Sequence, residues 1–249
     1  MKNILKTIAF LMMISLMTGC QKITTEGFTN VTFYPSITIL GDNPYTLEVG
    51  STFTDPGIKV MEGDEDITAK ATITGTVNKD QVDFYYITYS ATNKDGFSKS
   101  AIRTVIVYNP ESTTDISGNY SVNIDESYRI VNGTTTVIKY SDMAGLYPPY
   151  GDFSDFTVDI DRVSPGFFSV NDFYGGYYIA GRGYANIYMM GGYISVNPDN
   201  SIELISSRVP GWGDGLDYLI EAEYDPDTDT IKWGAGYAEL YTFYVVLNK

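Results

Sequence analysis

Short alternations of apolar and polar residues, separated by turn residues, run from about residue 34 to the end of the chain. The clearest is LDYLIEAEY at 216–224, in which one face is apolar and the other acidic. The apolar face holds Leu216, Tyr218, Ile220, Ala222 and Tyr224, and the acidic face holds Asp217, Glu221 and Glu223. A period of two residues predicts a half-buried antiparallel strand. These runs lack a helical period, so we expect an all-β protein.

The first group of strands falls within residues 34–109. Six or seven short strands are expected, among them runs at 36–40, 45–49, 70–77, 84–92 and 101–108. Turn residues separate them, as in Asp55-Pro56-Gly57, where Pro presets φ and Gly accepts the positive φ of a type II turn. This spacing predicts a small antiparallel sandwich. The polar stretch 110–117 is interpreted as a linker.

The second group, residues 118–249, contains further alternating runs at 120–124, 155–160, 216–224 and 238–247. Turn residues at 197–200 and 225–229 join neighbouring runs into hairpins. Two hairpins in one domain favour a meander, closed as an up-and-down, lipocalin-like barrel of roughly eight strands. A β-sandwich of two packed sheets is the alternative. Trp233 follows the second hairpin and is expected in the core.

Four motifs in the first domain follow one another in a specific order: VGSTFTDPGIKV, GDEDITAKATITGTV, YYITYSATNKDG and RTVIV. Together they resemble the Ig-like domain of bacterial surface proteins. The chain departs from that pattern at Asp83-Phe84, where Gly is usual, and at Gly96-Phe97, where Gly-Asn is usual. The resemblance implies a spacer or presentation module without an active site.

The N-terminus has the layout of a secretory signal, with Lys2 and Lys6, an apolar run and the small pair Thr18-Gly19 before Cys20. It resembles a bacterial lipoprotein lipobox, although Met17 stands where Leu is common. The resemblance implies removal of residues 1–19, acylation of Cys20 and membrane attachment, with 20–33 as a tether. An ordinary signal peptide with an unrelated Cys is the alternative.

Composition excludes several kinds of chemistry. The chain has no His and one Cys, which leaves no Ser-His-Asp triad, no imidazole metal site and no disulfide. A net charge of −15 argues against nucleic-acid binding.

Asp64, Glu65 and Asp66 are interpreted as a solvated turn. Asp225, Asp227 and Asp229 begin like a calcium loop but lack its Gly and Glu, so they are interpreted as a hairpin turn. We expect neither metal nor cofactor.

Candidate binding residues lie in three aromatic stretches of the second domain. In strand geometry, YYIAGRGYANIYMM at 177–190 would place Tyr178, Arg182, Tyr184, Asn186 and Tyr188 on one face. Trp212 and Asp214 share a Gly-rich loop, and Tyr147 and Tyr150 share another. Aromatic rings stack on sugars, and carboxylate and guanidinium groups bond their hydroxyls. The alternatives are cross-strand Tyr packing and rings that plug the barrel end.

The domain order also resembles that of two-domain Bacteroidota lipoproteins, many of which accompany polysaccharide-utilisation systems. That resemblance implies an outer-membrane, cell-surface location and an outer-membrane transporter complex as partner. We therefore expect a non-catalytic glycan-binding lipoprotein. The alternative is an envelope-assembly or adhesion protein that binds another protein. A carboxylate-based glycoside hydrolase is third, because no pair among the 31 acidic residues stands out.

Overall fold

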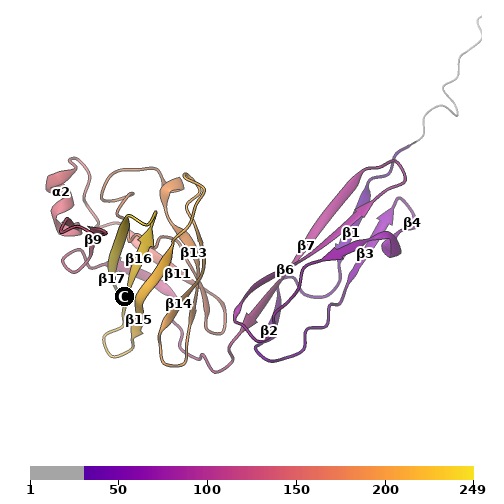
Figure 1. The fold of residues 1–249 in the computed structure, drawn as a ribbon, viewed down its shortest axis with the longest axis horizontal. Helices are drawn as coiled ribbons and strands as arrows, with labels where there is room; N and C mark the ends of the chain where they lie inside the picture. Colours follow the sequence, from indigo (N-terminus) through magenta and orange to yellow (C-terminus); the bar gives the residue numbers. More distant parts are fainter. Residues whose placement is uncertain (1–30) are drawn as a thin grey trace, which may run out of the picture.

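The computed structural model describes residues 31–249, which form two β domains joined by one linker (Figure 1). The signal peptide and Cys20 lie outside the described residues. None of the helices in residues 31–249 is long and apolar enough to cross a membrane.

The N-terminal domain is a sandwich of two small sheets. One sheet has the order β1 (Pro35–Ile39), β3 (Ile58–Glu62), β4 (Glu65–Asp66). The other has the order β2 (Tyr45–Glu48), β7 (Ser98–Tyr108), β6 (Asp83–Thr92), β5 (Thr72–Thr74), with β2 parallel to β7. A single 3-10 turn, η2 (Thr68–Lys70), precedes β5. The predicted sandwich is confirmed, and β3 and β4 are strands that the alternation had not indicated.

The signature motifs of this domain meet around Arg103, which is fully buried. Its Nε donates a 3.0 Å hydrogen bond to the Tyr89 hydroxyl and lies 3.2 Å from the Asp55 carboxylate. Its Nη atoms donate to the carbonyls of Leu40, Asp42 and Gly57. The Asp-Pro-Gly turn, the tyrosine strand and the final strand are thus tied together by one guanidinium. These bonds and the ion pair with Asp55 offset the cost of removing the charge from water.

The C-terminal domain is built on one antiparallel sheet of ten strands. In chain order they are β8 (Gly118–Val122), β9 (Tyr128–Val131), β10 (Val137–Lys139), β11 (Thr157–Ser164), β12 (Phe167–Val170), β13 (Gly191–Val196), β14 (Ile202–Arg208), β15 (Tyr218–Asp225), β16 (Thr230–Tyr237) and β17 (Tyr241–Asn248). Short helical turns lie at η3 (Tyr140–Asp142), α2 (Met143–Leu146) and η4 (Asn186–Tyr188).

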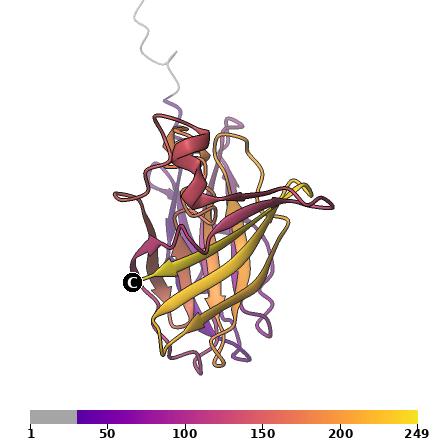
Figure 2. The same ribbon diagram turned by 90° about the vertical axis from the view of Figure 1, so that its left-hand side faces the viewer.

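The sheet follows a meander and curls on itself into a half-barrel (Figure 2). The last strand, β17, pairs with β8, the first strand of this domain, and Leu247 lies opposite Val122. At the other side, β14 and β15 are joined by a single bridge between Ser201 and Glu223. The hairpin β9–β10 pairs beside the first half of β17. Of the two predicted alternatives, the structure thus has the curled, barrel-like sheet and not two packed sheets.

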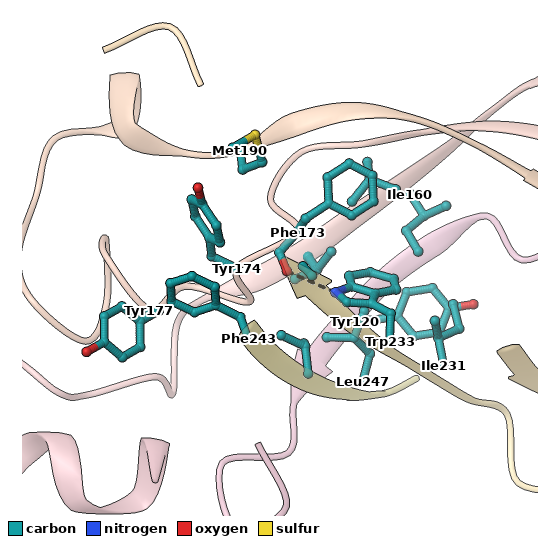
Figure 3. Close-up of a cluster of buried hydrophobic side chains, with 14 of the residues drawn as sticks. Tyr120, Ile160, Phe173, Tyr174, Tyr177, Met190, Ile231, Trp233, Phe243 and Leu247 are labelled. Carbon is teal, nitrogen blue, oxygen red and sulfur yellow. Dashed lines mark hydrogen bonds between the residues drawn. The ribbon is translucent and has the colours of Figure 1, made fainter. Parts of the chain in front are cut away.

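The predicted strand over 177–190 is wrong. The segment 171–190 forms successive turns and enters the half-barrel, where Phe173, Tyr174 and Tyr177 are fully buried (Figure 3). Gly175 and Gly176 have φ of 56° and 77°, in the left-handed region that a strand does not use. The alternation of aromatic residues here reflects the packing of a coiled interior segment, so it does not define a strand face.

A buried carboxylate closes this turn segment. Asp172 is 1% exposed and accepts backbone N–H bonds from Tyr174 at 3.2 Å, Gly176 at 2.8 Å and Met190 at 3.0 Å. Burial raises the pKa of its carboxyl to about 6, and the three N–H donors oppose that rise. Asp172 therefore joins the start of the segment to its end.

Strand β15 forms where the alternation predicts it, but its register shifts within the predicted face. A bulge lies between Ile220 and Glu223, and Glu221 has φ of 50°. Ile220 is consequently 38% exposed, whereas Leu219, Ala222 and Tyr224 pack against the core.

The predicted hairpin turns at 197–200 and 225–229 are present. Trp233 is 1% exposed, as predicted for a core residue.

Candidate ligand-binding surface

The structure brings the aromatic candidates from three separate loops into one network. We call it the aromatic surface and define it by Tyr147, Tyr150, Tyr178, Arg182, Tyr184, Tyr188, Trp212, Asp214 and Tyr237. Ring centres are 4.9 Å apart for Tyr178 and Trp212, and 5.4 Å apart for Tyr178 and Tyr184. Those of Tyr188 and Trp212 are 5.0 Å apart. Of the nine residues selected from the sequence, all but Asn186 are members of this surface.

Trp212 is held in a defined orientation while it remains 40% exposed. Its ring stacks on Tyr237 with an interplanar angle of 26° and meets Tyr178 edge-on. The neighbouring Gly211 donates its N–H to the Ile187 carbonyl at 2.7 Å, which fixes the loop against η4. A Cβ on Gly211 would lie 2.5 Å from the Tyr188 ring, so only glycine permits this approach. The indole thus combines a fixed position with an accessible face.

Asp214 is exposed and lies beside this indole. Its two carboxylate oxygens each accept a 3.1 Å hydrogen bond from the Tyr237 hydroxyl. Burial and the neighbouring carboxylate raise the pKa of Tyr237, which keeps its hydroxyl protonated as the donor. A carboxylate has about four acceptor positions, so Asp214 retains capacity for further donors from solvent or ligand.

Arg182 connects the other two loops. Its guanidinium carbon lies 4.8 Å from the ring centre of Tyr147 and 5.4 Å from that of Tyr184. The next residue, Gly183, has φ of 70° and lies against the Tyr150 ring, which a Cβ would approach to 2.2 Å. Tyr150 and Tyr184 are 48% and 37% exposed. This half of the surface is therefore also an accessible set of rings on a fixed support.

The members of the surface differ in what they offer to a ligand. Trp212, Tyr184 and Tyr150 present open rings, whereas Tyr178 is 6% exposed and supports the others from beneath. The single strand face predicted for Tyr178, Arg182 and Tyr184 does not exist, since the segment is coiled. The indole of Trp212 covers buried rings, as the alternative interpretation of a plug expects, and one part of it still faces solvent.

Sequence reasoning missed two residues that matter here. Tyr237 supports Trp212 and orients Asp214, but it lies at the end of β16, far from the loop in sequence. Arg129 lies on β9 and is 9% exposed, with its guanidinium over Tyr177 and Tyr241. An Arg within the apolar run YRIV was the available signal for Arg129.

Hollows adjoin the half-barrel at several places, and two of them bear on the candidate site. One of about 650 Å³ is open and lies between β10 and α2, where its lining includes Ile138, Ser141, Asp142 and Tyr147. It borders the aromatic surface through Tyr147. The other, of about 330 Å³, lies along β15–β17, and its lining includes Glu126, Glu223, Asp225 and Lys232.

Several carboxylates of residues 31–249 bear on the hydrolase alternative. Asp172 is the carboxyl with a raised pKa, but it is buried and both its oxygens accept backbone bonds. In the second hollow, Glu223 pairs with Lys232 at 2.7 Å, and a hydrogen bond from Thr228 lowers the pKa of Asp225. The described residues also contain no group of three or more His, Cys, Asp or Glu placed to hold a metal ion.

Comparison with known proteins gives matches for both domains. A family model described as a C-terminal domain matches residues 109–249, and that of the bacterial surface protein Ig-like domain matches residues 37–107. The lipoprotein BT2262 from Bacteroides thetaiotaomicron is 32% identical over 87% of this chain and 100% of its own, with a TM-score of 0.45. No curated protein matches the chain.

Two further solved structures come from ZmpB of Clostridium perfringens. One contains CBM51-2 in complex with GlcNAc and INT domains; it is 18% identical, covers 54% of this chain and 31% of its own, and has a TM-score of 0.28. The other contains the M60 catalytic domain with CBM51-1 and CBM51-2 and is 18% identical to this chain. The match covers 57% of this chain and 14% of the solved one, with a TM-score of 0.27. At these scores neither likeness bears on function.

Proposed function

Since the chain belongs to the family of the lipoprotein BT2262 and carries a bacterial surface protein Ig-like domain, we propose that it is a non-catalytic, glycan-binding lipoprotein of a bacterial outer membrane. Cys20 is the anchor in this proposal, and the Ig-like domain is the spacer that holds the C-terminal domain away from the membrane. The lipobox-like sequence at residues 16–20 supports the anchor independently of the relative.

The observation that carries the binding role is the fixed and half-exposed indole of Trp212. Sugar rings present C–H groups to aromatic faces, and rigid aromatic side chains contribute contact area at a low cost in conformational entropy. Trp212, Tyr184 and Tyr150 are exposed by 40%, 37% and 48% while their neighbours hold them in place. Asp214, already oriented by Tyr237, is placed to accept hydrogen bonds from sugar hydroxyls.

The proposal includes a place beside a polysaccharide-uptake system on the cell surface. A lipid-anchored module that binds a glycan raises the local concentration of that glycan next to a transporter. This effect comes from tethering the glycan to the membrane and requires no catalysis.

The direct test is affinity electrophoresis of residues 21–249, which contain both domains, against a panel of polysaccharides. We expect one class of glycan to retard the protein, and Trp212→Ala to abolish the retardation. Phe97→Ala is the matched control, because Phe97 is an aromatic residue of the Ig-like domain with a similar exposed fraction of 45%. Retardation that survives in Trp212→Ala would refute this site, and a panel without any retardation would refute glycan binding.

A second candidate function, binding of a protein partner, is favoured by exposed apolar residues beside the aromatic surface. Val137, Leu146 and Ile187 are exposed by 53%, 54% and 54%. Contiguous exposed apolar patches mark interaction sites, whereas single exposed apolar residues are normal on protein surfaces. A pull-down from outer membranes with Leu146→Asp as the negative control distinguishes this function from glycan capture.

A further inference from the structure

Arg129 is a buried guanidinium for which the described part of the chain supplies no acceptor. Its side chain is 9% exposed and lies opposite Phe243 on the neighbouring strand. The guanidinium carbon is 4.6 Å from the ring centre of Tyr241 and 5.1 Å from that of Tyr177. Within residues 31–249 it forms no salt bridge, and its Nε is enclosed without a hydrogen-bond partner. The Nη atoms are not among the enclosed ones and keep access to solvent.

Arg103 shows how this chain satisfies a buried arginine that serves the fold alone. It is bonded to Tyr89 and to three backbone carbonyls, and it pairs with Asp55. Arg129 has only the faces of two aromatic rings. Cation–π contact offsets part of the cost of removing a guanidinium from water, but it leaves the in-plane N–H donors unused. Those donors are the part of the side chain that recognises an anion.

A second unpaired guanidinium lies in the same region. Arg182 rests on Tyr147 and Tyr184 and forms no salt bridge within the described chain. The Tyr177 hydroxyl is buried close to the hydroxyl of Tyr147, the ring on which Arg182 rests. Arg129 lies over the Tyr177 ring at 5.1 Å and Arg182 over the Tyr147 ring at 4.8 Å, so the two guanidinium groups border neighbouring tyrosines. Burial raises the pKa of Tyr177, and the charges of Arg129 and Arg182 oppose that rise. Two like charges without a counter-ion repel each other, so a bound anion would stabilise this arrangement.

The acidic residues near this region are directed elsewhere. Asp214 lies at the Trp212 end and bonds to Tyr237, and Asp172 is enclosed by backbone donors. Asp142 lines the open hollow and is itself exposed. In a chain with a net charge of −15, two guanidinium groups without an acidic partner at one site are therefore a specific feature.

We propose that Arg129 and Arg182 bind an anionic substituent, a carboxylate or a sulfate, on the glycan that stacks on the aromatic surface. This inference rests on the function proposed above and names the class of its ligand. The planar guanidinium matches a carboxylate or sulfate with two parallel N–H donors. The hollow of about 650 Å³ is lined by Tyr147, which carries Arg182 on its ring, and by Ile138, which lies opposite Arg129 in the β9–β10 pair. Its volume lies in the range of ligand sites and offers a place for the sugar that carries the substituent.

The test uses two matched pairs of polysaccharides in affinity electrophoresis of residues 21–249. Polygalacturonate is compared with its methyl ester, and a sulfated galactan with its desulfated form. We expect the charged member of one pair to retard the protein at least about tenfold more strongly than its uncharged form, with a preference that weakens as salt is added. The pair that responds identifies the anion as carboxylate or sulfate.

The variants Arg182→Gln and Arg129→Lys then locate the site. Each should bring the ratio of charged to uncharged binding close to one, because the first removes a charge and the second removes the planar fork. Arg162→Gln is the control, since Arg162 is an exposed arginine that pairs with Asp115 near the linker. Thermal unfolding of each variant shows that it is folded, and the binding ratio is a readout that a merely structural arginine would not change.

Each remaining outcome overturns the inference. Equal binding of charged and uncharged forms would refute the anion site and leave glycan binding intact. Charged binding that both arginine variants retain would place the anion elsewhere. No binding by either member of either pair, with neutral glycans also inactive, would refute this inference and the proposed function together.

Discussion

The indole Nε1 of Trp233 donates a 2.9 Å hydrogen bond to the backbone carbonyl of Phe173, and the two rings also meet edge-on (Figure 3). This contact joins strand β16 to the coiled segment 171–190 inside the half-barrel. Tyr178, Arg182 and Tyr184 all lie on that segment, so the position of the aromatic surface depends on a bond made deep in the core.

Trp233→Phe removes this hydrogen bond and leaves space where the larger ring packed. We expect a loss of about 2–4 kcal/mol in the free energy of unfolding, from an unsatisfied carbonyl and a partly filled cavity. Urea denaturation followed by circular dichroism measures it. Trp212→Phe is the matched control, because Trp212 is 40% exposed and should cost less than about 1 kcal/mol. Equal effects of the two substitutions would contradict the structural role of Trp233.

Asp172 gives the protein a specific dependence on pH. Burial raises the pKa of its carboxyl to about 6 in the folded state, above the ordinary value of 3.8. Between these values the unfolded chain loses the proton while the folded chain keeps it. The contribution of this group to stability is therefore greatest below about pH 4, falls as pH rises to 6, and is constant above that. The total fall is about 3 kcal/mol.

Asp172→Asn should remove that fall, since the amide does not titrate. Unfolding free energies of both proteins at pH 4, 5, 6 and 7 test this, and the difference between them isolates Asp172 from other carboxyls. The variant also loses one acceptor for the Gly176 N–H, which should lower its stability by about 1–3 kcal/mol at pH 7. Parallel pH profiles for the two proteins would contradict the raised pKa.

The departure from the Ig-like pattern at Phe84 has a structural explanation. The Phe84 ring contacts the rings of Phe167 and Tyr193 in the C-terminal domain, with centres 4.7 and 4.6 Å apart. Phe84→Gly, which restores the residue usual in the family, should loosen this contact between the domains. We expect a larger radius of gyration in small-angle X-ray scattering, with each domain still folded by circular dichroism. An unchanged radius would show that the linker alone fixes the arrangement.

Much of the fold could be predicted from alternation and turn residues, because those signals are local. The strand at 216–224, the hairpin turns and the core position of Trp233 all depend on neighbouring residues in the sequence. The segment 171–190 could not be predicted in the same way. Its aromatic residues recur in a way that fits a strand, but the left-handed φ of Gly175 and Gly176 and the bonds to Asp172 produce turns.

The candidate site was partly predictable for a related reason. Residue chemistry selected Trp212, Tyr184 and Tyr150, which are aromatic residues in Gly-rich stretches, and the structure places them together. Their convergence depends on contacts distant in sequence, such as the stacking of Tyr237 on Trp212. Arg129 was missed because an arginine in a short strand is usually exposed, and the apolar neighbours in YRIV do not show by themselves that its side chain lies inward over Tyr177.

The close approach of Gly183 to Tyr150 offers a test of the surface that removes no aromatic residue. An alanine at this position would place its Cβ 2.2 Å from the Tyr150 ring, at a φ of 70° that side chains rarely adopt. The ring is exposed and can rotate away, so the stability cost of Gly183→Ala should be limited to about 1 kcal/mol from the backbone. Tyr150 would then leave its place beside Arg182, and we expect glycan affinity to fall several-fold, measured by affinity electrophoresis. Gly96→Ala is the control, since Gly96 lies in the Ig-like domain and also has positive φ, at 89°, with open space around its Cβ position. A similar loss of affinity in both variants would attribute the effect to the backbone, and the role of Tyr150 would be refuted.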